Sequence, residues 1–155
     1  MRPVPGIRSG VRSTLALIAL LSTATVFADK YYDQVRANLQ SRYDYWHNRD
    51  GGWNQLPDLR DTDLLDDGDY TTVTYTLIKG NSYKIVGACD NQCSDLDLEL
   101  RDNNNNLIDR DTASDDIPIV EVTPARDGKF TLKISMRDCS STAGCVYGVD
   151  VYRAR

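Results

Sequence analysis

Histidine is almost absent from this sequence, and the scarcity excludes most catalytic and metal-binding motifs. The single histidine, His47, lies beside Trp46, and the sequence has no nucleophile elbow that could complete a Ser/His/Asp triad with it. An HExxH pair and a glycine-rich phosphate loop are also missing. Carboxylates for a two-acid hydrolase are plentiful, but no spacing selects one pair. We therefore expect a protein that is not an enzyme, and a small secreted hydrolase is the least favoured function.

Long apolar runs are equally scarce, and the one strong run, Leu15–Leu21, lies near the N-terminus. It is shorter than the roughly 20 apolar residues that a membrane-spanning helix needs. The segment before it contains no acidic residue and three arginines, Arg2, Arg8 and Arg12. Val26-Phe27-Ala28 then places small residues where a signal peptidase cleaves. We expect residues 1–28 to be a signal peptide and Asp29 to be the first mature residue; an uncleaved membrane anchor is the alternative.

Basic residues are outnumbered in the expected mature chain. The sequence has 23 acidic and 18 basic residues, and removal of the three leader arginines leaves 15, which gives a formal net charge of −8. Such a surface repels phosphate backbones, so we expect no nucleic-acid partner. The 127 residues from 29 to 155 suffice for one domain with a core. We expect a secreted or periplasmic protein with no membrane association after cleavage.

Four cysteines fall into two close pairs. In an exported chain they predict two disulfides, and of the three possible pairings the spacing favours Cys89–Cys93 and Cys139–Cys145. Because each loop is short, each bond would contribute only about 2 kcal/mol and would fix its loop locally. A four-cysteine zinc site is the alternative, although the spacing and the oxidising destination disfavour it.

Residues 29–52 predict an amphipathic helix. Apolar residues recur at steps of three or four and share one face, namely Tyr32, Val35, Leu39, Tyr43 and Trp46. Gly51 and Gly52 then end the pattern. This stripe either packs on the domain, which is the commoner arrangement, or belongs to an aromatic binding surface. The candidate binding residues are Tyr31, Tyr43, Tyr45 and Trp46, because aromatic rings stack on sugars and peptide side chains.

The remaining sequence divides at Tyr70. Residues 53–69 are rich in aspartate and contain Pro57 and Gly68, so we expect an irregular acidic linker that lies along the domain. From residue 70 to 155 the apolar residues recur with the period of two that is typical of strands. Tyr83–Ala88 is apolar on both faces, which predicts a strand buried on both sides. Short strands separated by turns predict a mainly β, antiparallel sandwich preceded by one N-terminal helix.

Four segments follow one another in an order that is found in one known family. They are Tyr75–Ile85, Cys89–Leu100, Phe130–Met136 and Cys145–Val151. Together they resemble the bacterial pre-peptidase C-terminal domain over residues 70–152, although Asn105 stands where that family usually has glycine. The resemblance implies a jelly-roll-like sandwich of about seven to eight strands, similar to the collagen-binding modules of secreted collagenases. Such domains trail secreted hydrolases and serve secretion, folding or substrate attachment.

No peptidase domain accompanies the resembling segments here. We therefore expect the chain to stand alone as an exported, non-catalytic binding or accessory module. The resemblance implies that the partner is a protein or polysaccharide surface.

Acidic residues offer oxygen ligands for calcium, which is the one possible cofactor. The preferred set is Asp90, Asp95 and Asp97, around the first cysteine pair. A second group comprises Asp61, Asp63, Asp66, Asp67 and Asp69. The run from Asp102 begins like an EF-hand loop but has Leu107 at the required glycine position. A calcium-stabilised structural domain is thus the alternative function, and an ordinary solvent-facing strand is the other explanation of Asp95 and Asp97.

Overall fold

The computed structural model describes residues 15–49 and 52–155, with side chains described for 30–48 and from residue 52 onward. The chain forms two compact units, Met1–Lys30 and Tyr31–Arg155. Helix α1 (Leu15–Arg49) begins in the first unit and ends in the second. Within the described ranges, no helix has both the length and the apolarity required to cross a bilayer. The leader arginines and Gly51 lie outside the described residues.

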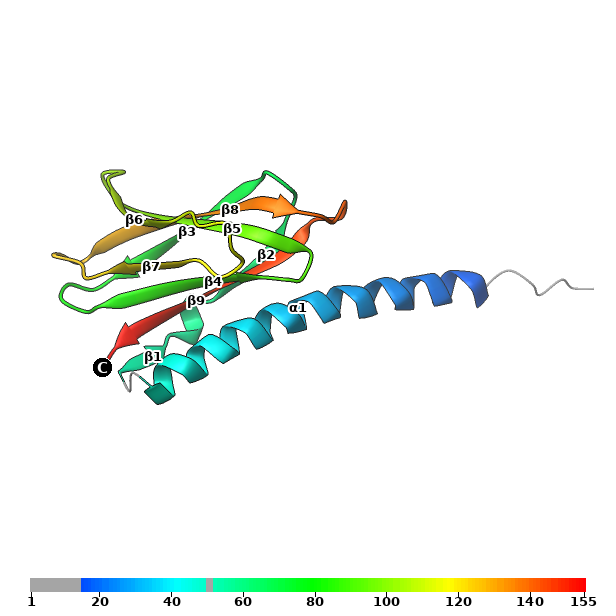
Figure 1. Ribbon diagram of the computed structural model, residues 1–155, viewed down its shortest axis with the longest axis horizontal. Coiled ribbons are helices and arrows are strands. Elements are labelled where there is room, and N and C mark those ends of the chain that lie inside the picture. The colour runs from blue at the N-terminus through cyan, green and yellow to red at the C-terminus, as the bar shows by residue number, and fades with distance from the viewer. Residues whose placement is uncertain (1–14, 50–51) are drawn as a thin grey trace, which may run out of the picture. The chain divides into compact units, whose positions relative to one another are not determined.

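Residues of the second unit form two antiparallel sheets that pack face to face (Figure 1). Sheet A contains β1 (Trp53–Gln55), β2 (Asp61–Leu65), β4 (Tyr83–Cys89), β7 (Ile119–Val122) and β9 (Cys145–Ala154). Its order is β1-β9-β4-β7, and β2 also pairs with β9. Sheet B has the order β3-β8-β5-β6, formed by β3 (Tyr70–Leu77), β8 (Gly128–Cys139), β5 (Cys93–Asp102) and β6 (Leu107–Asp111).

The core lies between the two sheets and follows from the period of two. On β5 the inward residues Leu96, Leu98 and Leu100 are fully buried, while the residues between them lie on the outer face. The same alternation buries Ile85 on β4 and Ile134 on β8. The predicted fold class is therefore confirmed: the protein is a mainly β, jelly-roll-like antiparallel sandwich with one N-terminal helix.

Residues 53–69 are not irregular, and this corrects the sequence-based expectation. They form β1, the short 3-10 helix η1 (Pro57–Leu59) and β2, and they raise the strand count to nine. β1 and β2 share the edge of β9 that β4 leaves open, with Trp53 opposite Ala154 and Leu65 opposite Cys145. Strands of three and five residues are too short to show a period. β2 also contains two aspartates, which strands disfavour.

The C-terminal part of α1 packs on the outer face of sheet A. Val35, Leu39 and Trp46 are buried in a second apolar cluster together with Val86, Ala88, Val146 and Tyr152. Gly148 permits this close approach, because a Cβ atom added there would lie 2.6 Å from Cγ1 of Val35 and 3.0 Å from Cδ1 of Leu39. Strand β4 is consequently buried on both sides, as its sequence predicts.

Both predicted disulfides are formed, and no described cysteine is free. Cys89–Cys93 closes the loop between β4 and β5, and Cys139–Cys145 joins the end of β8 to the start of β9. The first loop also contacts α1: the Asn91 amide donates to Oε1 of Gln34 at 3.2 Å, and Nδ2 of Asn38 donates to the Cys89 carbonyl at 3.2 Å. This disulfide therefore fixes a loop that forms hydrogen bonds with α1. Because all four sulfurs are oxidised, they cannot form the alternative four-cysteine zinc site.

Candidate functional site

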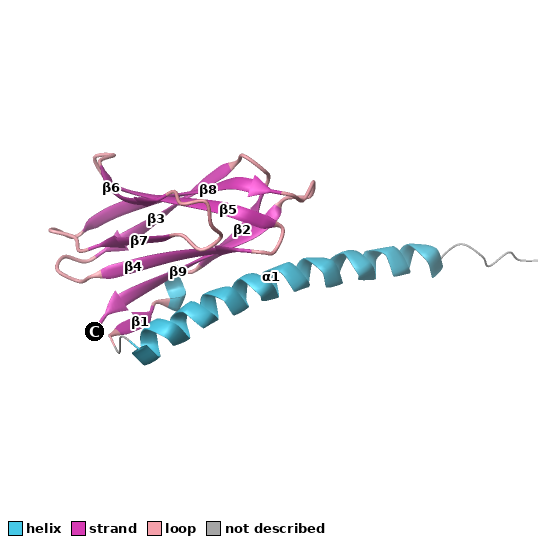
Figure 2. Cartoon of the chain, viewed as in Figure 1, coloured by secondary structure: helices cyan, strands magenta, loops and turns pink. Residues whose placement is uncertain are grey.

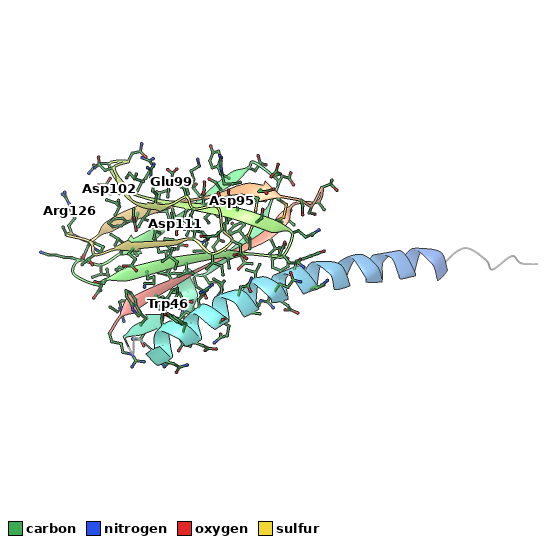
Figure 3. The ribbon with its side chains drawn as sticks, in the orientation of Figure 1. Trp46, Asp95, Glu99, Asp102, Asp111 and Arg126 are labelled. Atoms are coloured by element: carbon green, nitrogen blue, oxygen red, sulfur yellow. A yellow bond between two sulfur atoms is a disulfide. The ribbon has the colours of Figure 1, made fainter. Side chains whose placement is uncertain are left out.

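A concave site lies at one end of the sandwich, where β5 ends and β8 begins. Loops gather at the ends of the sheets (Figure 2), and here two of them enclose a pocket of about 280 Å³. We call it the hairpin-end pocket. Its apolar wall consists of Ile108, Val122, Pro124 and Phe130, and its charged rim consists of Asp102, Arg126, Asp127 and Lys129. Figure 3 shows Asp102 and Arg126 at the same end of the sandwich.

The first wall is the turn between β5 and β6, which Asp102 holds together. Its Oδ1 accepts the amides of Asn104 and Asn106, both at 2.9 Å, and its Oδ2 accepts Nδ2 of Asn106 at 3.0 Å. Asn105 adopts a left-handed conformation with φ 64°, which asparagine tolerates best after glycine. The Asn106 side chain lowers the pKa of Asp102, with further contributions from backbone amides and Arg126. The carboxylate is thus ionised and committed to its own turn.

The second wall is the loop between β7 and β8, and the turn that follows β3 braces it. Oδ1 of Asp127 accepts the Lys79 amide at 2.7 Å, and the Gly80 amide donates to the Pro124 carbonyl at 2.9 Å. The hydroxyls of Ser82 and Thr123 lie 2.8 Å apart. Both walls are therefore held by hydrogen bonds, and Asp127 is committed in the same way as Asp102.

Arg126 differs from the two acids of the rim. Its side chain is exposed, and no hydrogen bond or ion pair joins its guanidinium to another residue in the described part of the chain. Its only recorded electrostatic effect is the distant attraction that helps to lower the pKa of Asp102. The pocket thus combines an apolar wall, two carboxylates that accept backbone hydrogen bonds, and two exposed cations, Arg126 and Lys129.

The aromatic residues expected on a binding surface do not form one exposed strip. Trp46 is buried edge-on against Tyr152, with ring centroids 5.5 Å apart, and Tyr43 stacks 6.3 Å from the same ring. Tyr31 packs at the margin of this cluster. Tyr45 alone remains largely exposed, at 47%. Most of the candidate set therefore attaches α1 to sheet A, and Figure 3 shows Trp46 between the helix and the sandwich.

His47 belongs to the same attachment. Its ring stacks on Tyr43 with centroids 5.0 Å apart. Nδ1 lies 3.4 Å from the Trp53 carbonyl oxygen and 3.3 Å from Nη2 of Arg155. These contacts connect the end of α1 to β1 and to the C-terminus of the chain.

The structure does not bring Asp90, Asp95 and Asp97 together as metal ligands, and no cluster of three or more potential ligands occurs among the described residues. Asp90 is buried, and its two oxygens accept the amides of Gln92 at 2.8 Å and Val146 at 2.7 Å. It therefore ties the first disulfide loop to β9. The oxygens expected to bind a metal therefore accept hydrogen bonds from backbone donors.

Asp95 and Asp97 lie on β5, on the outer side of sheet B, followed by Glu99 (Figure 3). Burial raises the pKa of Asp97, and the negative charges of Asp95 and Glu99 raise it further, although Nε of Arg137 lies 3.4 Å from Oδ2. Oδ1 of Asp95 is buried without a hydrogen-bond partner in the described structure. Asp95, Asp97 and Glu99 thus form a row of like charges on β5, in which ionisation of Asp97 is disfavoured.

The second acidic group is also dispersed into structural roles. Oδ2 of Asp61 accepts the hydroxyl of Tyr147 at 2.9 Å, and Oδ1 of Asp67 accepts the Cys139 amide at 2.9 Å. Asp63 accepts the amide of Leu64. Aspartate carboxylates in this protein commonly accept hydrogen bonds from backbone amides. The high density of acidic residues is therefore no evidence of a cation site here.

Comparison with solved structures finds similar folds, two of which follow. One is the pre-peptidase C-terminal domain of a collagenase from Bacillus anthracis, with 15% identity over 59% of this chain and 86% of that chain, and a TM-score of 0.48. The other is PliG of Aeromonas hydrophila, a periplasmic inhibitor of g-type lysozyme, with 11% identity over 67% of this chain and 87% of that chain, and a TM-score of 0.41. The first represents the family that the sequence resembles. No protein-family model matches the sequence, and no curated protein matches it.

Both turns of the hairpin-end pocket have sequences typical of turns, but the sequence does not show the pocket itself. Asp102–Asn106 and Asp127-Gly128 are visible as turns because asparagine, aspartate and glycine favour them. Their proximity depends on the pairing of β5 with β8, in which Asp102 lies opposite Phe130. The length of the chain between the two turns hides this pairing from a reading of the sequence.

Proposed function

We propose that this protein is an exported, non-catalytic binding module and that the hairpin-end pocket is its binding site. The observation that carries the proposal is the state of the charged rim. Asp102 is held by the amides of its own turn and Asp127 by the Lys79 amide of the neighbouring turn, whereas the Arg126 guanidinium is available. A small, braced pocket of this kind suits recognition, because a preformed site loses little conformational freedom on binding.

We expect the pocket to bind a ligand that has an apolar body beside an anionic group. Its wall of Ile108, Val122, Pro124 and Phe130 accepts an apolar body, and guanidinium groups bind carboxylates through charge-assisted, paired hydrogen bonds. Lys129 adds a second positive charge to the rim. A protein segment that presents a carboxylate beside an apolar side chain meets both requirements. A polysaccharide partner is less favoured, because the aromatic residues expected to stack on sugars are mostly packed against sheet A.

Export is part of the proposal and is supported by the two disulfides, which are typical of oxidising compartments. Cleavage after Ala28 would leave the described packing face of α1 intact, since that face begins at Tyr31. The intact mass of the protein recovered from a secreting host checks this step. A mass that corresponds to residues 29–155 is expected, and retention of the leader would contradict it.

A titration with two matched probes tests the binding site. Phenylacetate and phenylacetamide share an aromatic body and differ in the charge of the head group. We expect phenylacetate to shift the backbone amide resonances of residues 122–130, and phenylacetamide to bind more weakly. Arg126→Gln should weaken phenylacetate binding by about tenfold, because one charge-assisted contact is lost.

The matched control is Arg110→Gln, which removes another exposed arginine outside the pocket. It should leave phenylacetate binding unchanged. Equal affinity for the two probes, or shifts that map elsewhere on the sandwich, would overturn the assignment of this pocket.

A further inference from the structure

Strand edges in this protein are protected unequally. An edge strand presents unpaired backbone groups to other chains, and natural proteins usually block it with charges, bulges or short length. At one side of the sandwich, β7 is blocked by carboxylates of β6. Oδ2 of Asp109 accepts the Glu121 amide at 2.7 Å, and Oδ2 of Asp111 accepts the Ile119 amide at 2.9 Å. These side chains occupy the donors that a further strand would need.

The other short edges carry similar protection. β6 has five residues, three of them charged, and its pairing with β5 shifts register between Leu100 and Arg101. β1 has only three residues, and β2 contains Asp61 and Asp63 among its five. Each of these edges is too short or too charged to accept a long partner strand.

β3 lacks all of these devices. It has eight residues, Tyr70–Leu77, with no charged residue and no proline. It pairs with β8 without a register shift, from Tyr70 opposite Ser135 to Leu77 opposite Gly128. Within the described chain, no backbone hydrogen bond is recorded along its other side. This edge is therefore the one in the sandwich that is long, regular and open.

We propose that a second copy of this chain pairs with β3 in an antiparallel manner about a twofold axis at Thr74. Opposite residues of an antiparallel pair point to the same face, so Thr72 of one copy would face Thr76 of the other. The two four-stranded B sheets would join into one continuous sheet of eight strands. The proposal is independent of the hairpin-end pocket.

Self-pairing suits this edge better than pairing with a different chain. A twofold axis pairs the strand with the identical strand of a second copy. A charged edge strand would then face the same charges and be repelled, whereas β3 is neutral. Two large apolar residues, Tyr70 and Ile78, remain 62% and 47% exposed at opposite ends of the strand. The twofold pairing would bring Tyr70 of each copy beside Ile78 of the other, the residue that follows β3, so that the two apolar side chains contact each other.

Sedimentation of the full chain over a wide range of concentrations tests the proposal. The wild-type protein should show a reversible monomer–dimer equilibrium. Thr72→Lys combined with Thr76→Lys places lysine opposite lysine twice in the pairing. Because like charges directly opposite each other destabilise strand pairs, the dissociation constant should rise by about tenfold or more.

The matched control adds the same charge elsewhere, by Thr112→Lys combined with Ser114→Lys in the exposed loop after β6. That variant should dimerise as the wild type does. Circular dichroism of both double variants verifies folding. A wild-type protein that stays monomeric up to its solubility limit overturns the proposal, and so does a dimer that the β3 lysines leave unchanged.

Discussion

The two outer faces of the sandwich differ, although both belong to antiparallel sheets of one fold. Sheet A is covered: Val86 and Ala88 on its outer face are fully buried beneath α1. Sheet B is uncovered, and charged residues such as Asp97, Glu99 and Arg101 occupy its outer face. The covered face is held by apolar packing, while the uncovered face carries ionic groups, among which Glu99 pairs with Arg101 and Asp97 with Arg137.

The difference between the two faces separates residues that stabilise the fold from residues that we propose to bind partners. Side chains under α1 are committed to the attachment of the helix, so the aromatic residues expected to bind a ligand contribute to folding. The surfaces that we propose to contact partners lie elsewhere, at the hairpin-end pocket and along β3. We therefore expect substitutions beneath α1 to change the free energy of unfolding strongly, and substitutions on sheet B to change it little.

The largest effect is expected for Leu39→Ala, which opens a cavity between α1 and sheet A. Leu39 is 1% exposed, and such truncations cost about 3 kcal/mol in the free energy of unfolding. The exposed Thr72→Ala on sheet B should cost roughly 0.5 kcal/mol or less. Urea unfolding followed by tryptophan fluorescence measures both. Similar values for the two variants would show that the helix is not part of the cooperative unit.

A smaller but clear effect is expected at the ion pair between Arg60, which is 40% exposed, and the buried carboxylate of Asp150. Asp150 is 1% exposed and accepts Nε of Arg60 at 2.6 Å and Nε2 of Gln55 at 2.6 Å. The hydrogen bond to Asp150 raises the pKa of Arg60. Arg60→Ala leaves the carboxylate buried with fewer donors, and the free energy of unfolding should fall by about 2 kcal/mol.

The exposed pair formed by Arg36 and Asp33 provides the comparison. Its side chains are 65% and 71% exposed, and exposed pairs typically contribute less than about 1 kcal/mol. Arg36→Ala should therefore leave the thermal midpoint nearly unchanged, whereas Arg60→Ala should lower it by several degrees. Equal losses would contradict the distinction between the covered and the exposed pair.

The smallest effect concerns the charge row on sheet B. The folded protein raises the pKa of Asp97, so it binds the proton more tightly than the unfolded chain does. Ionised Asp97 therefore destabilises the fold at neutral pH, and this penalty disappears as the pH falls below the unfolded pKa. Asp97→Asn should stabilise the protein at pH 7 by roughly 0.5 kcal/mol, with little gain near pH 3. Destabilisation at both pH values would contradict this account.

Several features were predictable from the sequence because they depend on local patterns. The stripe that includes Val35 and Leu39 has helical spacing, the period of two marks the sandwich, and short cysteine loops indicate both disulfides. β1 and β2 were missed because they are short and because their pairing with β9 is a tertiary contact that their own sequences do not reveal. Asp90 looked like a metal ligand, since the sequence cannot show that backbone amides already saturate its oxygens.

Recognition through Arg126 is the central functional claim, and differential capture tests it most directly. The wild-type chain, Arg126→Gln and Arg110→Gln are immobilised and exposed to the secreted fraction of the producing organism, and retained proteins are quantified by mass spectrometry. We predict partners that the wild type and Arg110→Gln retain equally and that Arg126→Gln retains about tenfold less. Identical sets on all three baits, or no specific partner on the wild type, would contradict the account.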